Sequence, residues 1–423
     1  MSDDVVGKIR LKTSVAFIAR FLKNVYLLHV DSCIAIGKNK SKIPVTNMKY
    51  TVPSKTLHSF ASAVSKVINA KNAITILNNF LFSIKGNVLT ITACDGENTL
   101  CARIPIMGVE GEGDFCIDAR RVVELLRVMP EQELNFNVDD ATLTVEMTHP
   151  NGSYKFMGLP GKDYPVLKKV AQEGAKTFKT SGSSLLRGLE YTSFAAGTDM
   201  LRPQMTGVYW DIKPDRLIFV ATDTHKLVKF EDNSIASGIE GSFILPNKST
   251  NVFRSVFSKD EEVTVTLDPE RGVTFETDTF TFDSRLIKGR FPDYTRVIPE
   301  NNPYTLTINR HQFTTAVRRV SLFVDEGHGL IKFRVTPDKL TIKASDNEYN
   351  TSGYETLASD FTGNEMIIGF SSSYLTELAS VLWTDDIIFR LADPSRPAVI
   401  VPTEDKADTK LTMLLMPMNV QEF

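Results

Sequence analysis

The chain has 423 residues, of which 42% are apolar and 23% are charged, with a formal net charge of −3. This composition is typical of a globular protein, and the acidic balance excludes a broadly basic surface that binds nucleic acid through net charge alone. The length exceeds what one hydrophobic core usually supports, so several domains are expected. No run of 18 apolar residues occurs, so no transmembrane helix is predicted.

Residues 1–47 differ from the rest of the chain in charge. They hold eight Lys or Arg and three Asp, a net of +5, whereas the remaining residues carry a net of −8. Their apolar stretch is interrupted by Arg20, Lys23 and Asp31, unlike the apolar core of a secretory signal. We therefore interpret residues 1–47 as a leader outside the folded domains and expect Met48 to be the true start.

After this leader, one pattern occurs three times. Similar segments begin at Tyr50, Phe178 and Leu306, at intervals of 128 residues. Each reads as a strand, then a Ser or Asn that could cap a helix, then an apolar residue that opens the helix. A period near 128 residues has the size of a domain, so the sequence predicts three copies of one domain.

A second repeated feature is a strand that ends in an aspartate, at Asp95, Asp223 and Asp346. His225 follows Asp223 and suggests an acid–base pair, but no histidine follows the other two aspartates at the same place. We therefore favour a turn in which the aspartate side chain accepts hydrogen bonds from the backbone. A hydrolase built on Asp223 and His225 is the less favoured alternative.

The elements of each copy are predicted in the same order: a helix, a two-stranded hairpin, a second helix and further strands. Two helices against an antiparallel sheet make an α+β domain. The predicted first helices are 55–68, 184–195 and 311–323; the hairpins are 80–84 with 88–93, 207–212 with 216–221, and 329–335 with 339–344; the second helices are 119–128, 248–257 and 372–382.

Motifs for catalysis or cofactor binding are absent from the sequence. There is no phosphate-binding G-x-x-x-x-G-K-[ST] loop, no H-E-x-x-H and no C-x-x-C. The four cysteines, Cys33, Cys94, Cys101 and Cys116, read as reduced thiols of a cytoplasm-like compartment. No enzyme activity, cofactor or metal is therefore predicted.

Basic residues recur on the predicted helices at equivalent places in the three copies. Such residues often form only a solvated face. If the helices share one face, however, they would contact phosphates without reading bases, which gives sequence-independent, salt-sensitive binding. These residues are Lys55, Lys66, Lys71, Arg120, Arg121, Arg127, Arg187, Lys248, Arg254, Arg318 and Arg319.

Four short segments carry a resemblance to a known family. They are Ala-Thr-Asp-Thr-His-Lys-Leu-Val at 221–228, Gly-Arg-Phe-Pro-Asp-Tyr at 289–294, Leu-Arg-Pro-Gln-Met-Thr-Gly-Val at 201–208, and Met-Pro-Met at 416–418. In order and spacing the chain resembles the bacterial DNA polymerase III beta subunit, the sliding clamp, from residue 48 to the C-terminus. The resemblance implies clamp domains at 48–168, 176–300 and 303–423.

The resemblance also implies a function. Members of this family are head-to-tail homodimers that close into a ring around double-stranded DNA without reading its sequence. They tether the polymerase III alpha subunit, the clamp loader and other proteins that carry a clamp-binding motif. The implied protein is cytoplasmic, not bound to a membrane, non-catalytic and free of cofactors. A DNA-binding scaffold that does not encircle DNA is the alternative.

Three groups of site residues are implied by family position. The chain departs from the family at three positions: Thr224 stands where glycine is usual, Gln204 where an aromatic residue is common, and Asn419 where arginine is common. These departures concern which peptide the pocket prefers. The partner-peptide pocket comprises Arg202, Gln204, Met205, Thr222, Thr224, His225, Lys226, Leu227, Pro292, Val297, Tyr374, Leu414, Met416, Pro417 and Met418; the DNA-contacting residues are Lys71, Arg202 and Arg296; the dimer interface comprises Tyr154, Phe156, Arg319, Leu322 and Phe323.

Overall fold

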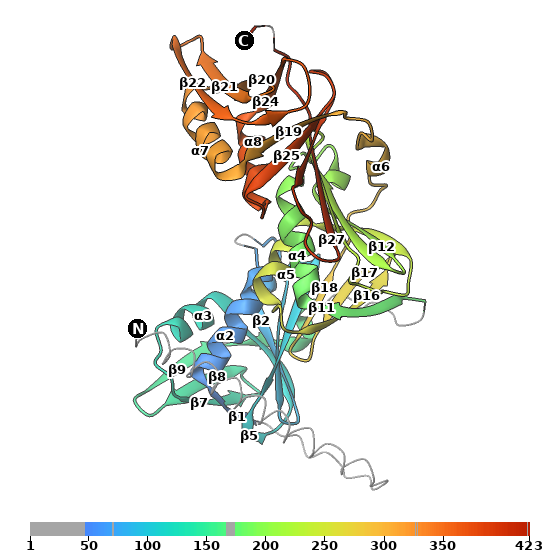
Figure 1. Ribbon diagram of the computed structural model, residues 1–423. Coiled ribbons are helices and arrows are strands. Elements are labelled where there is room, and N and C mark those ends of the chain that lie inside the picture. The colour runs from blue at the N-terminus through green and yellow to red at the C-terminus, as the bar shows by residue number, and fades with distance from the viewer. Residues whose placement is uncertain (1–46, 70–71, 166–173, 326, 328, 421) are drawn as a thin grey trace, which may run out of the picture. The chain divides into compact units, whose positions relative to one another are not determined.

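A computed structural model describes residues 47–69, 72–165, 174–325, 327, 329–420 and 422–423 (Figure 1). The predictions for the leader, for Cys33 and for Lys71 lie outside these residues. The described residues form three successive α+β domains, which confirms the predicted class and the repeat.

The first domain contains two helices and most of two sheets. Its helix α2 packs beside α3, as Figure 1 shows. Its elements are β1 (Asn47–Pro53), α2 (Ser54–Val64), β2 (Asn79–Lys85), β3 (Val88–Cys94), β4 (Asn98–Pro105), β5 (Met107–Glu110), β6 (Gly113–Asp118), α3 (Ala119–Arg127), β7 (Glu133–Asp139), β8 (Thr144–His149), β9 (Gly152–Met157) and β10 (Leu159–Pro160).

The second domain repeats this order and adds a short helix, α6, at its end. Its elements are β11 (Lys176–Ser181), α4 (Gly182–Thr192), β12 (Gly207–Lys213), β13 (Arg216–Thr222), β14 (Lys226–Asp232), β15 (Gly241–Pro246), α5 (Asn247–Val256), β16 (Glu262–Asp268), β17 (Gly272–Glu276), β18 (Phe280–Ser284) and α6 (Tyr294–Val297).

The third domain repeats the order again, with α7 packed beside α8. Its elements are β19 (Tyr304–Asn309), α7 (Arg310–Val320), β20 (Leu330–Thr336), β21 (Lys339–Asp346), β22 (Thr351–Ala358), β23 (Asp360–Phe361), β24 (Met366–Ser371), α8 (Ser372–Val381), β25 (Asp386–Leu391), β26 (Ala398–Pro402) and β27 (Thr409–Leu415).

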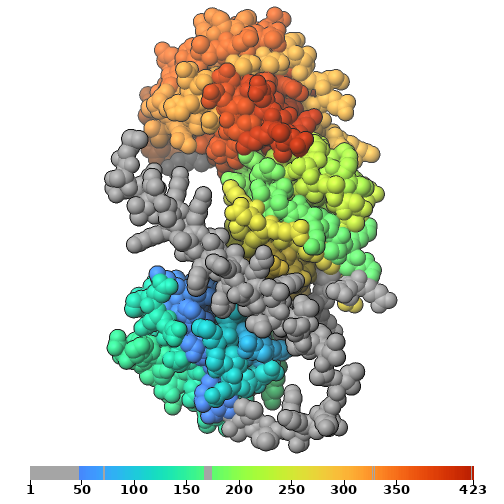
Figure 2. Space-filling view, turned by 60° about the horizontal axis from the view of Figure 1, so that its bottom comes forward, coloured from blue at the N-terminus to red at the C-terminus, as the bar shows by residue number. Residues whose placement is uncertain are grey.

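Two sheets run across the domain boundaries. One nine-stranded sheet has the order β10-β6-β2-β3-β4-β18-β17-β16-β11, and the other has the order β15-β12-β13-β14-β27-β26-β25-β19-β23. The joining pairs, β4 with β18 and β14 with β27, are antiparallel. Figure 2 shows the red C-terminal surface lying directly against the green surface of the second domain. A five-stranded sheet, β5-β1-β7-β8-β9, and a four-stranded sheet, β22-β21-β20-β24, remain at the two ends of the chain.

The core follows from the alternation of apolar residues along the strands. In β16, for example, Val263, Val265 and Leu267 are buried while the residues between them are not. Side chains two residues apart point to the same face of a sheet, so these three valine and leucine side chains pack under the helices. Phe253 of α5 meets this face through an edge-on contact with Phe275 of β17, at 4.9 Å between ring centroids.

All three predicted first helices end earlier than expected. Each α-helix stops after Val64, Thr192 or Val320, and a single 3-10 turn follows at Ser65–Val67, Ser193–Ala195 and Ser321–Phe323. A 3-10 turn is tighter than an α-turn and commonly ends a helix. Apolar periodicity continues through such a turn, so the sequence pattern did not separate the two.

The capping prediction holds for two of the three copies. The Ser181 hydroxyl accepts a hydrogen bond from the N–H of Ser184, and the Asn309 amide oxygen accepts one from Gln312. The prediction is wrong for the first copy. There the helix already begins at Ser54, and the Ser54 hydroxyl oxygen accepts from the N–H of Gln132 at 3.0 Å instead of capping α2.

Candidate partner site and nucleic-acid interface

The three aspartates at the strand ends build the same turn. In each, the Oδ1 atom accepts hydrogen bonds from the backbone N–H groups two and three residues later, at 2.6–3.1 Å. This confirms the structural interpretation of Asp95, Asp223 and Asp346. The Asp223 carboxylate also pairs with Lys226, and His225 stacks on Tyr374, so the geometry gives no support to a hydrolase site.

The turn after Asp223 holds a strained residue. Thr224 has a φ of 81°, a left-handed conformation that is unusual for a β-branched side chain. The turn is fixed by Thr222, whose hydroxyl accepts from the N–H of Thr224 at 3.2 Å and donates to the carbonyl of Lys226 at 2.7 Å. Strain of this kind persists only where the surrounding structure imposes it.

Two of the expected pocket walls lie side by side. Leu227 of β14 and Leu414 of β27 are directly opposite in the register, and both are buried in one small apolar cluster. The backbone N–H of Met416 donates to the carbonyl of His225 at 2.8 Å, so the C-terminal segment is held against the turn. Met416 itself is exposed.

Lys226 connects this turn to helix α8 of the third domain. Its side chain is only 5% exposed, and its Nζ lies 3.0 Å from Asp223 Oδ2 and 2.8 Å from Glu377 Oε2. The ammonium also lies 4.2 Å from the ring centroid of Tyr374. Burial opposes the charge, but hydrogen bonds to Glu377 and Asp223 outweigh it and raise the pKa of Lys226.

Glu377 was missed by sequence reasoning. It lies three residues after Tyr374 on α8, and residues three apart on a helix share a face. That spacing is the signal that could have found it. Because Lys226 comes from the second domain and Glu377 from the third, the pair ties the two domains together at the expected pocket.

The remaining residues expected at the pocket lie on other segments. Arg202 is exposed and precedes the 3-10 turn Pro203–Met205, which holds Gln204 and Met205. The carbonyl of Met205 accepts from Gly197 at 2.8 Å. Val297 is exposed at the end of α6, and Pro292 is half-buried just before that helix. Pro417 and Met418 are half-buried, and the N–H of Met418 donates to the carbonyl of Gly369 in β24.

The expected DNA-contacting residues differ in whether they already have an acidic partner. Arg202 is exposed, and Arg296 is exposed but pairs with Asp293 at 2.9 Å. Several of the helical basic residues also have acidic partners within the chain, so they are less available to phosphates than the sequence suggested. The pairs are Lys55 with Glu131, Arg120 with Glu124, Arg187 with Asp232, Lys248 with Asp95, and Arg319 with Glu355.

The expected dimer residues lie in two groups in the first and third domains. Tyr154 and Phe156 are on β9, at an edge of the five-stranded sheet. Leu322 and Phe323 are in the 3-10 turn after α7, with Leu322 81% exposed. The ring of Phe323 packs against Gly353 of the edge strand β22 so closely that a Cβ at Gly353 would lie 2.6 Å from the ring.

Three further observations concern the described part of the chain. No helix within the described ranges is long and apolar enough to cross a membrane. In the same residues, no group of three His, Cys, Asp or Glu side chains could hold a metal ion. Cys94 and Cys116 are buried, and burial raises the pKa of the Cys116 thiol to about 12.

The comparisons with known proteins agree with the three-domain fold. Three family models match in order: the DNA polymerase III beta subunit N-terminal domain at 48–168, the central domain at 180–293 and the C-terminal domain at 295–419. The beta sliding clamp of Staphylococcus aureus is 26% identical over 383 residues, covering 88% of this chain and 99% of the relative.

Solved structures of similar proteins cover the same part of the chain. The sliding clamp of Pseudomonas aeruginosa is 25% identical with a TM-score of 0.82, and that of Bartonella birtlesii is 27% identical with a TM-score of 0.82. Each match covers 88% of this chain and 100% of the other. On these findings, the chain belongs to the DNA polymerase III beta subunit family.

Proposed function

We propose that this protein is the processivity factor of a bacterial replicative polymerase: a homodimeric ring that encircles double-stranded DNA and tethers its partners. The ring is non-catalytic and works by topology, so its affinity for DNA need not be high. The clamp domains are 48–168, 176–300 and 303–423, and the protein acts in the cytoplasm with the polymerase III alpha subunit and the clamp loader.

The proposal of a closed ring rests mainly on how the strands pair at the domain junctions. At both domain junctions, the third strand of the hairpin meander of one domain pairs with the last strand of the next domain. These pairs are β4 with β18 and β14 with β27. By the order of elements, β22 of the third domain corresponds to β4 and β14, and β9 of the first domain corresponds to β18 and β27. Both β22 and β9 lie at sheet edges.

Pairing β22 of one subunit with β9 of another would complete the pattern. At each junction between subunits, the four-stranded sheet of one and the five-stranded sheet of the other would join into a nine-stranded sheet like the two within each chain. A single chain has one such edge at each end, so two subunits joined head to tail at both ends form a closed dimer. Closure would also protect edge strands that otherwise invite aggregation.

Apolar residues at these edges support this interface. Leu322 and Tyr154 are exposed, and Phe323 and Phe156 lie beside them. Burying each such side chain contributes about 1.5–3 kcal/mol. We therefore expect sedimentation velocity at low micromolar concentration to show a dimer for the wild type and monomers for Leu322→Ala/Phe323→Ala. An intact dimer in the double variant would contradict this interface.

The DNA contact is proposed to be sequence-independent. Arg202, Arg296 and Lys71 are the residues proposed to touch phosphates. Several helical basic residues have acidic partners within the chain, which supports weak, salt-sensitive binding. Weak contact suits a ring that slides. A scaffold that binds DNA without encircling it would need stronger contacts.

The partner site is proposed to be the cleft beside the Asp223 turn. The buried Leu227 and Leu414 would form its apolar base, the exposed Met416 an apolar wall, and His225 with Lys226 a polar edge. An apolar cleft with a few fixed polar groups suits a short peptide that inserts leucine or phenylalanine. Tyr374 and Met418 at the rim would re-pack around different peptides.

A further inference from the structure

A large groove lies next to the proposed peptide pocket and is not part of it. Its volume is about 1260 Å³, and it is formed by the segment 283–295 together with β12, β15 and the β16–β17 turn. Of the fifteen proposed pocket residues, Pro292 alone also lines this groove. Sequence reasoning did not find it, because its walls come from four separate segments.

Three basic side chains from one short segment line the groove. Arg285, Lys288 and Arg290 are exposed, and among the described residues none of the three forms an ion pair or a side-chain hydrogen bond. All three lie on the six-residue stretch between β18 and Phe291. Like charges within six consecutive residues tend to repel one another, so an anionic ligand would be favoured there.

Two of the four carboxylates that line the groove form ion pairs. Asp211 pairs with Lys213 at 3.2 Å and accepts a hydrogen bond from the Tyr294 hydroxyl at 2.8 Å. Asp293 pairs with Arg296, and Asp283 accepts from Thr274. Glu270 is exposed, while Arg271 pairs with Asp268 at 3.6 Å. Three exposed cations therefore stand against Glu270 and the buried Asp283, so the groove keeps an excess of positive charge.

The groove and the peptide pocket share one apolar floor. Ile244, Phe291 and Tyr294 line the groove, and they belong to the same buried cluster as Leu227 and Leu414 of the pocket. The groove and the proposed pocket therefore rest on one buried apolar cluster, and Pro292 belongs to both. Tyr209 extends this floor by stacking on Phe291, with 4.7 Å between ring centroids.

We propose that this groove binds an acidic segment that flanks the clamp-binding peptide of a partner protein. The inference rests on the proposed function and names the chemistry of the partner beside the inserted motif. Lys288 and Arg290, next to Pro292 in sequence, make the first contacts, and Arg285 extends them. Exposed charge pairs of this kind act mainly through the association rate and are weakened by salt.

The test compares two fluorescent peptides by fluorescence polarisation. Both carry the same Gln-Leu-x-Leu-Phe-type motif, and their flanks on both sides are runs of glutamate in one and of glutamine in the other. At low salt, we expect the acidic peptide to bind the wild type about tenfold more tightly, as two or three exposed ion pairs allow. At high salt the two affinities should converge.

Two variants localise the effect. Lys288→Gln/Arg290→Gln should lose the advantage of the acidic flank while keeping the affinity for the neutral peptide. The matched control Lys85→Gln/Arg127→Gln removes two exposed cations from the first domain and should keep the advantage. Equal affinities of the two peptides for the wild type, or an advantage that survives in Lys288→Gln/Arg290→Gln, would overturn the groove.

The same experiment separates this proposal from the proposed function. If the neutral peptide binds and the acidic flank adds nothing, the pocket stands and the groove fails. If neither peptide binds the wild type, the pocket assignment fails and the groove proposal fails with it. An equal loss of the advantage in the control would assign the effect to net charge and would also overturn the groove.

Discussion

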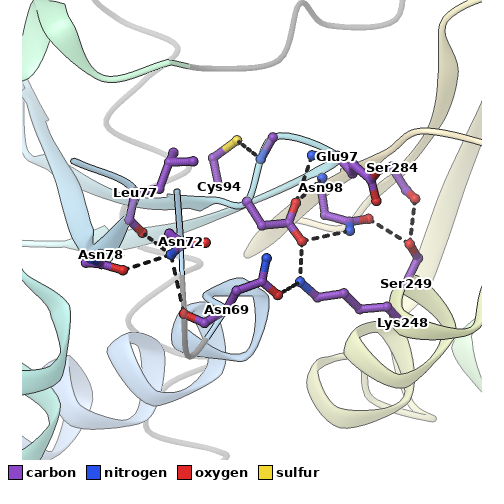
Figure 3. A network of polar contacts seen from close by, with 12 residues as sticks. Asn69, Asn72, Leu77, Asn78, Cys94, Glu97, Asn98, Lys248, Ser249 and Ser284 are labelled. Atoms are coloured by element: carbon purple, nitrogen blue, oxygen red, sulfur yellow. Dashed lines mark hydrogen bonds and ion pairs between the residues drawn. The ribbon is translucent and has the colours of Figure 1, made fainter. Parts of the chain in front are cut away.

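Lys248 of the second domain donates a hydrogen bond to the carboxylate of Asp95 in the first domain, 153 residues away in the sequence. Figure 3 shows the lysine reaching from its helix to Asn69 as well. Beside it, Ser249 bonds to Asn98 at 2.7 Å and accepts from Ser284 at 2.8 Å. This polar network fastens the junction where β4 meets β18.

Loss of the lysine should destabilise this junction. The Asp95 side chain is 2% exposed, so Lys248→Met leaves a buried carboxylate without its cationic partner. Because Lys248 is itself partly exposed, we expect a cost of about 2 kcal/mol, less than for a fully buried pair. The midpoint of urea unfolding should fall. Lys259→Met, which removes an exposed lysine with no ion pair among the described residues, is the control and should leave the midpoint unchanged.

The same pair predicts a dependence on pH. Burial tends to raise the pKa of Asp95, but hydrogen bonds from Lys248 and from the backbone of Asn98 and Glu97 outweigh it, and the net pKa is lowered. A lowered folded-state pKa stabilises the protein fully above the unfolded value of about 3.9, and this stabilisation is lost as the pH falls further. Thermal unfolding below about pH 4 should therefore decline more steeply for the wild type than for Asp95→Asn. Parallel curves would contradict this role.

Relief of strain at Thr224 should stabilise the protein. Its φ of 81° is left-handed, where glycine is unstrained and threonine is not. Thr224→Gly should raise the free energy of unfolding by up to about 1 kcal/mol, since the relief exceeds the added freedom of the unfolded chain. The control is Thr198, an exposed threonine whose φ is not positive, and Thr198→Gly should not stabilise the protein. A drop in stability for Thr224→Gly would show that the turn is not strained.

The C-terminal segment should be essential for peptide capture. Met416→Ala removes an exposed apolar wall, and we expect affinity for a Gln-Leu-x-Leu-Phe-type peptide to fall about tenfold. Removal of residues 416–423 should abolish binding while leaving β27 and the dimer intact. Met107→Ala, an exposed methionine of the first domain, is the matched control. Equal affinity of wild type, Met416→Ala and the truncated protein would exclude this site.

Local sequence patterns predicted much of the fold. The three Asp turns, the hairpins and the start of each second helix were predicted, because turns and helix starts depend on neighbouring residues. The cap at Ser54 was predicted wrongly because the N–H of Gln132, distant in the sequence, donates to its hydroxyl oxygen. The pairing of β4 with β18 was not predicted, since no local signal specifies which strand edges meet.

Some residues of the candidate sites were predicted from the sequence and others were not. Family resemblance named Leu227 and Leu414, which the structure places opposite each other on adjacent strands. It did not name Glu377, because an ion pair between domains depends on how α8 packs against the Asp223 turn. The basic groove was missed for a similar reason: the lack of partners for Lys288 and Arg290 among the described residues is visible only when their surroundings are known.

The most direct test of the ring is topological. The protein would be loaded onto nicked circular DNA by the clamp loader and passed through a gel-filtration column at about 0.5 M NaCl, where ordinary phosphate contacts are lost. We predict that it stays with circular DNA and leaves after a single restriction cut linearises the circle. Retention on linear DNA with free ends, or loss from intact circles at this salt, would contradict encirclement.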